Sequence, residues 1–195
     1  VLQLVSGLGF EAHRFLRWPH FAFGLDVIAQ HGAPAGVTHC FNFCEDNLAI
    51  PDILSQARLR GQQSGAIYAG GVYPPEAWAL FQAGAAQLVD VRSAEELKFV
   101  GHVPGGQHVA WMTGAALVKN PRFVRELEKI ASKDSVILLL CRSGKRSAAA
   151  AEAATLAGFT AVYNVLEGFE GDLDTQQRRG DSGGWRHWGL PWVQD

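Results

Sequence analysis

The sequence predicts an α/β fold of three layers, α/β/α, in which helices cover both faces of a central, mainly parallel sheet. Two observations carry this prediction. Apolar runs of strand length alternate with helical patterns from about residue 65 to residue 193, and such alternation favours parallel pairing. The run 136–140 is apolar at every position and begins with a β-branched residue, as expected of a strand buried on both faces. A chain of 195 residues is long enough for one core of ordinary size.

The first part of the chain differs from the rest. Pro19, Gly32 and Pro34 interrupt it, and neither a period of 2 nor one of 3.6 persists. We therefore expect residues 1–50 to be an N-terminal extension of irregular structure and residues 51–195 to be the folded domain.

The net charge and the cysteine content limit the kinds of partner and the cellular compartment that we expect. A net charge of −2 gives no electrostatic reason to expect a nucleic acid or a membrane as partner. Three cysteines are an odd number and lack the spacing of a small disulfide-rich domain, which favours a reducing, cytoplasmic location. No apolar run is long enough to span a membrane, and residues 1–10 lack the basic start of a signal peptide. His39, Cys40 and Cys44 form one short cluster with no second pair, so we predict no metal site there.

The first half of the expected domain contains two helices and two strands before a third, well-marked helix. The patterns predict a helix over 51–61, a strand from Gly70, a helix opened by Pro74 and Pro75, and a strand over 87–92. Ser93 and Glu96 have the spacing of a capping box, so a short helix should follow at once. We expect a turn over 101–106 and a short strand over 107–111.

Three polar residues in this half are candidates for structural roles. Asp90 and Arg92 stand at the end of a predicted strand, and an ion pair between them is favoured over direct contact with a substrate. His102 lies in the predicted turn, where we expect a packing role because an ionised thiol needs no general base.

The second half contains two helices, two strands and a polar insertion. Asn120 and Pro121 should open a helix that continues to Ile130, and an alanine-rich helix should run over 147–156 after the strand 136–140. A buried strand is predicted over 161–166. The stretch 172–184 has too few apolar residues to bury, so we expect a solvated surface loop that could also modify the rim of a site. Trp188 and Trp192 are predicted to cover the core.

Chemistry concentrates directly after the strand 136–140. Cys141 ends this strand and precedes a helix, at the edge of a parallel sheet where ligands bind. The first N–H groups of a helix have no partner within the helix and attract anions. Arg142, Lys145 and Arg146 add positive charge, which favours the thiolate form of Cys141. A buried structural cysteine is the alternative, but it would have no need of three neighbouring cations.

The segment Cys141-Arg142-Ser143-Gly144-Lys145-Arg146-Ser147 resembles the active-site loop of rhodanese-type sulfurtransferases, in which four residues separate cysteine from arginine and Ser or Thr follows. Protein tyrosine phosphatases and dual-specificity phosphatases place five residues there, which makes a wider ring suited to phosphate. The segments 90–92, 95–96 and 101–105 also resemble this family, as does the closing Gly-Leu-Pro at 189–191. Phe169 departs from the family, because it replaces the second of two adjacent glycines.

The resemblance implies a single rhodanese-like domain whose nucleophile is Cys141. Its thiolate would take a sulfane sulfur from thiosulfate or a persulfide donor and pass it to cyanide or to a small-molecule or protein thiol. No metal or organic cofactor is required. The amides that would bind the anionic sulfur donor belong to Arg142, Ser143, Gly144, Lys145, Arg146 and Ser147. Two alternatives are a phosphatase or arsenate reductase on the same fold and a non-catalytic regulatory module, although such modules commonly lack the cysteine.

Overall fold

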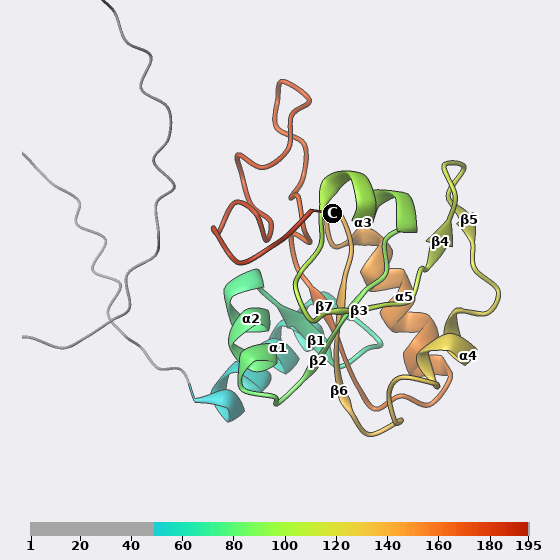
Figure 1. Ribbon diagram of the computed structural model, residues 1–195. Coiled ribbons are helices and arrows are strands. Elements are labelled where there is room, and N and C mark those ends of the chain that lie inside the picture. Colours follow the sequence, from blue (N-terminus) through green and yellow to red (C-terminus); the bar gives the residue numbers. More distant parts are fainter. Residues whose placement is uncertain (1–48, 195) are drawn as a thin grey trace, which may run out of the picture. The chain divides into compact units, whose positions relative to one another are not determined.

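A computed structural model of the protein describes residues 49–194. Its centre is a parallel sheet of five strands in the order β1-β7-β6-β2-β3 (Figure 1). The predicted α/β class with a mainly parallel sheet is therefore confirmed. The strands are β1 (Gly70–Val72), β2 (Gln87–Asp90), β3 (Gln107–His108), β6 (Val136–Leu140) and β7 (Ala161–Val165).

Helices cover both faces of the sheet. The bounds of the five helices are α1 (Ile50–Ser64), α2 (Pro74–Gln82), α3 (Ala94–Val100), α4 (Phe123–Leu127) and α5 (Lys145–Leu156). In Figure 1, α1 and α2 lie on one side of the strands and α4 and α5 on the other. The helix α3 connects β2 to β3, and a small antiparallel hairpin of β4 (Met112–Thr113) and β5 (Val118–Lys119) follows β3.

The central strand β6 serves two separate cores. Side chains alternate across a strand, so Ile137 and Leu139 pack with α4 and α5, while Leu138 and Leu140 pack with α1 and α2. All four are completely buried, which is the reason that this strand is apolar at every position. The same alternation directs the next residue, Cys141, towards the α5 side of the sheet.

Several element boundaries differ from those predicted. The strand β2 stops at Asp90 rather than residue 92, because the Asp90 carboxylate accepts the N–H of Arg92 and turns the chain. The strand β3 has two residues rather than five, because the N–H groups of Val109 and Trp111 bond to the consecutive carbonyls of Asp90 and Val91 and the regular register with β2 is lost. The helix α4 is also shorter than expected, although Asn120 Oδ1 does accept the N–H of Arg122 as a cap would.

The prediction that Trp188 and Trp192 cover the core was wrong. They are 47% and 37% exposed, whereas Trp185 is fully buried. The indole N–H of Trp185 donates to the carbonyl of Pro191 over 2.9 Å, and its ring meets Trp78 edge to face at 5.9 Å. The Pro191 carbonyl satisfies the buried indole N–H of Trp185, whereas Trp188 stays exposed although its N–H donates to Glu167 Oε2 over 2.9 Å.

All but the last two residues of the expected extension 1–50 lie outside the described residues, as do His39, Cys40 and Cys44. Within residues 49–194, no helix combines the length and the apolar character that crossing a bilayer requires.

Candidate active site

Cys141 stands where β6 ends and only three residues separate it from the start of α5. The residue is 1% exposed, so its thiol lies beneath the loop rather than on the surface. One polar side chain touches it: Ser147 Oγ lies 3.1 Å from Cys141 Sγ. Ser147 is itself fully buried and also lies 2.6 Å from the Oδ1 of Asn164, on the neighbouring strand β7. The thiol therefore has a built polar environment inside an apolar core.

The backbone N–H groups that follow Cys141 are unpaired. None of those of residues 142–147 donates to an acceptor in the part of the chain that the structure describes, whereas the next one, that of Ala148, donates to the Gly144 carbonyl over 3.1 Å. Gly144 has a φ of +84°, which turns the chain into the helix. Consecutive free amides at a helix N-terminus form a concavity that suits an anion.

The carbonyl groups of the same loop are held from outside. The N–H of Phe169 donates to the Cys141 carbonyl over 2.7 Å, and that of Glu170 donates to the Arg142 carbonyl over 2.9 Å. Gly168 makes this contact possible, because a Cβ there would lie 2.5 Å from the Cys141 carbonyl oxygen. The segment after β7 thus holds the loop through the loop's carbonyl groups and leaves the loop's N–H groups free.

The three predicted cations are placed differently from one another. Arg146 makes a two-pronged contact with the carboxylate of Glu96 on α3, at 2.7 and 2.6 Å. Arg142 is exposed, and Lys145 is exposed with its amine 3.2 Å from Asp172. Only Arg146 is partly buried beside the thiol, and it is locked to α3 rather than free to follow a ligand.

The pair between Arg146 and Glu96 shifts both groups towards their charged forms. Burial alone would raise the pKa of the Glu96 carboxyl, but hydrogen bonds from Arg146 and from the Ser93 backbone lower it overall. The hydrogen bond to Glu96 raises the pKa of Arg146, and a smaller contribution to this rise comes from Cys141. The positive charge of Arg146 is therefore a permanent feature of the site.

The ion pair predicted between Asp90 and Arg92 is confirmed. Arg92 is fully buried, and its Nη2 lies 2.6 Å from Asp90 Oδ2 and donates to the Gly101 carbonyl over 2.8 Å. Its guanidinium also lies 4.0 Å from the ring centre of Phe169. His102 pairs with Val193 through its backbone, as expected of a packing residue.

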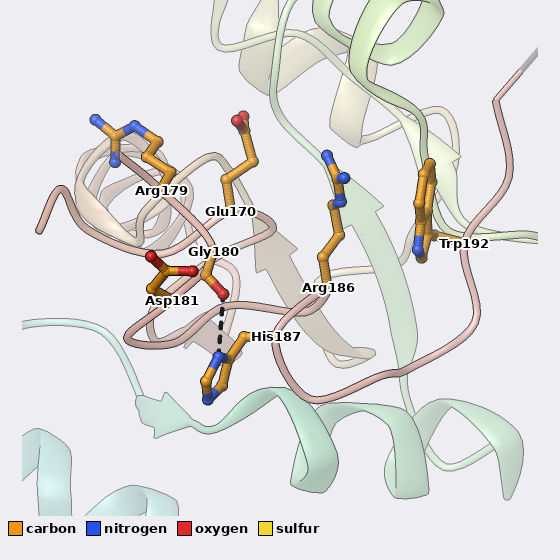
Figure 2. Close-up of a pocket in the computed structure, with 7 residues that line it drawn as sticks. All are labelled: Glu170, Arg179, Gly180, Asp181, Arg186, His187 and Trp192. Atoms are coloured by element: carbon orange, nitrogen blue, oxygen red, sulfur yellow. Dashed lines mark hydrogen bonds between the residues drawn. The ribbon is translucent and has the colours of Figure 1, made fainter. Parts of the chain in front are cut away.

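A cavity of about 380 Å³ lies beyond the loop (Figure 2). Glu170, which holds the Arg142 carbonyl, forms part of its wall. The guanidinium of Arg186 lies 4.5 Å from the ring centre of Trp192, and His187 Nδ1 lies 3.1 Å from the Gly180 carbonyl. The lining residues are Glu170, Arg179, Gly180, Asp181, Arg186, His187 and Trp192.

The polar insertion 172–184 is thus more than a solvated loop, because Arg179, Gly180 and Asp181 belong to this wall. No pattern in the sequence indicated this cavity. For Asn164 a signal existed, since it is the one polar side chain in the predicted strand 161–166 apart from a tyrosine, and a buried amide requires partners.

Comparisons with known proteins identify the family of this fold. A family model, that of the rhodanese-like domain, matches residues 73–174. The chain is 36% identical over 109 residues to the uncharacterized protein RP600 of Rickettsia prowazekii, covering 54% of this chain and 80% of that protein. It is 34% identical over 85 residues to the chloroplastic thiosulfate sulfurtransferase 16 of Arabidopsis thaliana, covering 43% and 70%. The crystal structure of Rv0390 from M. tuberculosis superposes with a TM-score of 0.59 at 44% identity, covering 66% of this chain and 99% of that one.

Proposed function

Since the chain belongs to the rhodanese-like domain family, we propose that it is a sulfurtransferase that carries a sulfane sulfur as a persulfide on Cys141. The observation that supports this proposal best is the run of unpaired N–H groups at residues 142–147, directly after the cysteine. A terminal persulfide sulfur is a small anion that can accept several such donors at once. The similarity to a thiosulfate sulfurtransferase is the reason to choose thiosulfate as the first donor to test.

In the first step, the Cys141 thiolate attacks the outer sulfur of thiosulfate. A bond forms between Sγ and that sulfur, the sulfur–sulfur bond of the donor breaks, and sulfite leaves with the electron pair. The persulfide keeps one negative charge and sulfite leaves with two, so the total charge is unchanged; no proton is transferred, and no general base is needed. The free amides of the loop and the charge of Arg146 favour the anions on both sides of this step.

In the second step, an acceptor such as cyanide or a thiolate attacks the terminal sulfur of the persulfide. The new bond to the acceptor forms as the bond to Sγ breaks, and the Cys141 thiolate is restored with its electron pair. Thiocyanate is the product when cyanide is the acceptor, and a persulfide is the product when a thiol is the acceptor. The cycle consumes no metal and no organic cofactor.

The burial of Cys141 limits the shape of the donor. Because the residue is 1% exposed, a donor must reach the sulfur with a narrow end and with some displacement of the loop side chains. A thiosulfate presents a single sulfur atom, whereas a phosphate ester presents a phosphorus atom shielded by its oxygens. The four-residue spacing between Cys141 and Arg146 points in the same direction.

The experiment that tests the proposal measures thiocyanate formation from thiosulfate and cyanide, with the native chain and with Cys141→Ser. We expect turnover by the native chain and none by the variant. A chromogenic phosphate ester, tested in parallel, should not be hydrolysed. Equal thiocyanate formation by the two proteins, or hydrolysis of the ester without thiocyanate formation, would contradict the proposal.

A further inference from the structure

The hydroxyl of Ser147 has more acceptors around it than it can serve. Its Oγ lies 3.1 Å from Cys141 Sγ, 3.1 Å from the Gly144 carbonyl and 2.6 Å from Asn164 Oδ1. A hydroxyl carries one hydrogen, so it can donate to one of the three at a time. The Gly144 carbonyl already has one donor, the N–H of Ala148, so it depends least on the hydroxyl. The competition that concerns the cysteine is between its sulfur and the amide of Asn164.

The Asn164 amide decides this competition through its orientation. With Oδ1 towards Ser147, the amide takes the hydroxyl hydrogen over the shortest of the three distances, and a neutral Cys141 thiol can then donate to Ser147 Oγ. With the amide turned by half a rotation, Nδ2 donates to Ser147 Oγ and releases the hydroxyl hydrogen to the sulfur. The two orientations differ only in the exchange of O and N, which diffraction at ordinary resolution does not distinguish.

Tyr68 stands at the other end of this amide. The Asn164 amide lies close enough to the Tyr68 phenol to lower its pKa, as a hydrogen-bond donor would, and Tyr68 packs beside the core on the α5 side of the sheet. Burial raises the pKa of Tyr68 more than the amide lowers it, and Glu152 on α5 raises it further. Tyr68 thus keeps its hydrogen at neutral pH and can donate it to the amide oxygen once the amide has turned.

We propose that Asn164 and Tyr68 are positioning residues that aim the Ser147 hydroxyl at the sulfur of Cys141 when this sulfur is negatively charged. The resulting chain of donors runs in one direction, from the Tyr68 hydroxyl to Asn164 Oδ1, from Asn164 Nδ2 to Ser147 Oγ, and from the Ser147 hydroxyl to Sγ. It moves no proton to or from the cysteine. This inference rests on the proposed function, because it needs a charged sulfur at Cys141.

The variants below keep every native charged group around this chain of donors, and only Asn164→Asp adds a new charge. Arg146 of α5 lies beside the thiol and is paired with Glu96 of α3, and the pair of Asp90 and Arg92 closes the end of β2. Near Tyr68, the charged groups are Glu152 and, across a cavity of about 380 Å³ that Tyr68 helps to line, Arg60. None of the variants below removes any of these six charges.

The test measures how fast iodoacetamide alkylates Cys141 across a range of pH, with the full chain and without any sulfur donor. Mass spectrometry of the tryptic peptide 134–142 separates Cys141 from Cys40 and Cys44. Tyr68→Phe should move the midpoint of this pH profile upward by about 0.3 to 0.5 pH unit, because it removes only the outermost donor. Asn164→Asp should move it upward by about one unit or more, because a carboxylate holds the Ser147 hydrogen and repels the thiolate.

Two further variants separate positioning from packing. Tyr163→Phe removes a buried hydroxyl from the opposite face of the same strand, one that has no hydrogen-bond partner among the described residues, and should leave the midpoint in place. In a Ser147→Ala background, Tyr68→Phe should no longer shift the midpoint, because the link to the sulfur is missing.

A Tyr68→Phe midpoint within about 0.1 unit of the native one, or a shift that persists without Ser147, would overturn the inference. If the native chain formed no thiocyanate while the variants shifted the midpoint as predicted, only the proposed function would be overturned.

Discussion

Two loops leave the same edge of the sheet side by side, and they use their polar groups in opposite ways. Asp90 and Leu140 are partners in the register of β2 and β6, so the residues after them are neighbours. In the loop after β2, most of the polar groups form hydrogen bonds with one another. Asp90 accepts from Arg92, and Ser93 and Glu96 form the reciprocal contacts of a capping box.

The loop after β6 is left open. Its carbonyls at Cys141 and Arg142 are held by the chain near Phe169, but the N–H groups of 142–147 find no acceptor in the described part of the chain. A donor without a partner in the protein is satisfied by solvent or by a ligand, and consecutive donors of this kind suit an anion. The candidate site is therefore the loop after β6, whose N–H groups are unpaired (the open loop). The neighbouring loop after β2, whose polar groups pair with one another (the closed loop), supports it.

The closed loop should be the more important of the two for stability. In Arg92→Met the Asp90 carboxylate, which is 5% exposed, loses its partner and stays buried. We expect the free energy of unfolding, measured with urea, to fall by about 3–5 kcal/mol. Arg178→Met removes an arginine from an exposed ion pair and should leave stability almost unchanged. Similar decreases in the free energy of unfolding for Arg92→Met and Arg178→Met would contradict the stabilising role of the buried ion pair.

The open loop should depend on Gly168 for its shape. In Gly168→Ala the new Cβ would meet the Cys141 carbonyl at 2.5 Å, and the φ of +66° is unfavourable for alanine. We expect a loss of about 2–4 kcal/mol of stability or a displaced loop, with loss of thiocyanate formation in either case.

A matched control for Gly168 exists in this chain. Gly84 has the same φ of +66°, and a Cβ there would meet nothing within 4 Å. Gly84→Ala therefore carries the backbone strain without the clash, costs about 1 kcal/mol and should keep full activity. Inactivity of both variants would remove the argument that the contact with the loop matters.

The ion pair between Glu96 and Arg146, which joins α3 to α5, should contribute less to stability at acid pH. The pKa of Glu96 is lower in the folded protein than its ordinary value of 4.5, so its stabilising contribution is complete above that value and is lost as the pH falls through the folded pKa. Glu96→Gln should lower stability at pH 7 by about 1–2 kcal/mol and flatten its dependence on pH below 4.5. Urea unfolding at pH 7 and pH 3 measures this; a difference between the proteins that does not shrink in acid would contradict it.

The smallest effect is expected outside both loops, in the cavity of Figure 2. Arg186 lines it and offers a positive charge to an anionic donor. Arg186→Ala should raise the KM for thiosulfate about two- to five-fold without changing kcat, and the difference should fade in high salt. Arg125→Ala, on α4 and outside the lining of this cavity, should change neither the KM for thiosulfate nor its dependence on salt. A change in kcat alone would mean that Arg186 does not act on donor binding.

The parts of the molecule that local rules govern could be predicted from the sequence. The strand 136–140 and the placement of Cys141 follow from hydrophobic patterning, and the capping box at Ser93 follows from spacing. The pairing of Asp90 with Arg92 was also predictable, because two opposite charges two residues apart at a strand end readily meet.

Other parts depend on contacts that no local pattern records. The strands of the hairpin at 112–119 have two residues each, too few to show a period. The burial of Trp185 rather than Trp188 or Trp192 depends on tertiary contacts such as its edge-to-face contact with Trp78. The contact of Asn164 with Ser147 joins residues that are 17 positions apart, and the cavity wall joins segments whose course only the fold defines.

The most direct measurement of the central claim is the intact mass of the full chain before and after incubation with thiosulfate. The proposal predicts the addition of one sulfur atom to the native chain, located in the tryptic peptide 134–142, and no addition to Cys141→Ser. An unchanged mass of the native chain, or a sulfur that the variant carries as well, would contradict it.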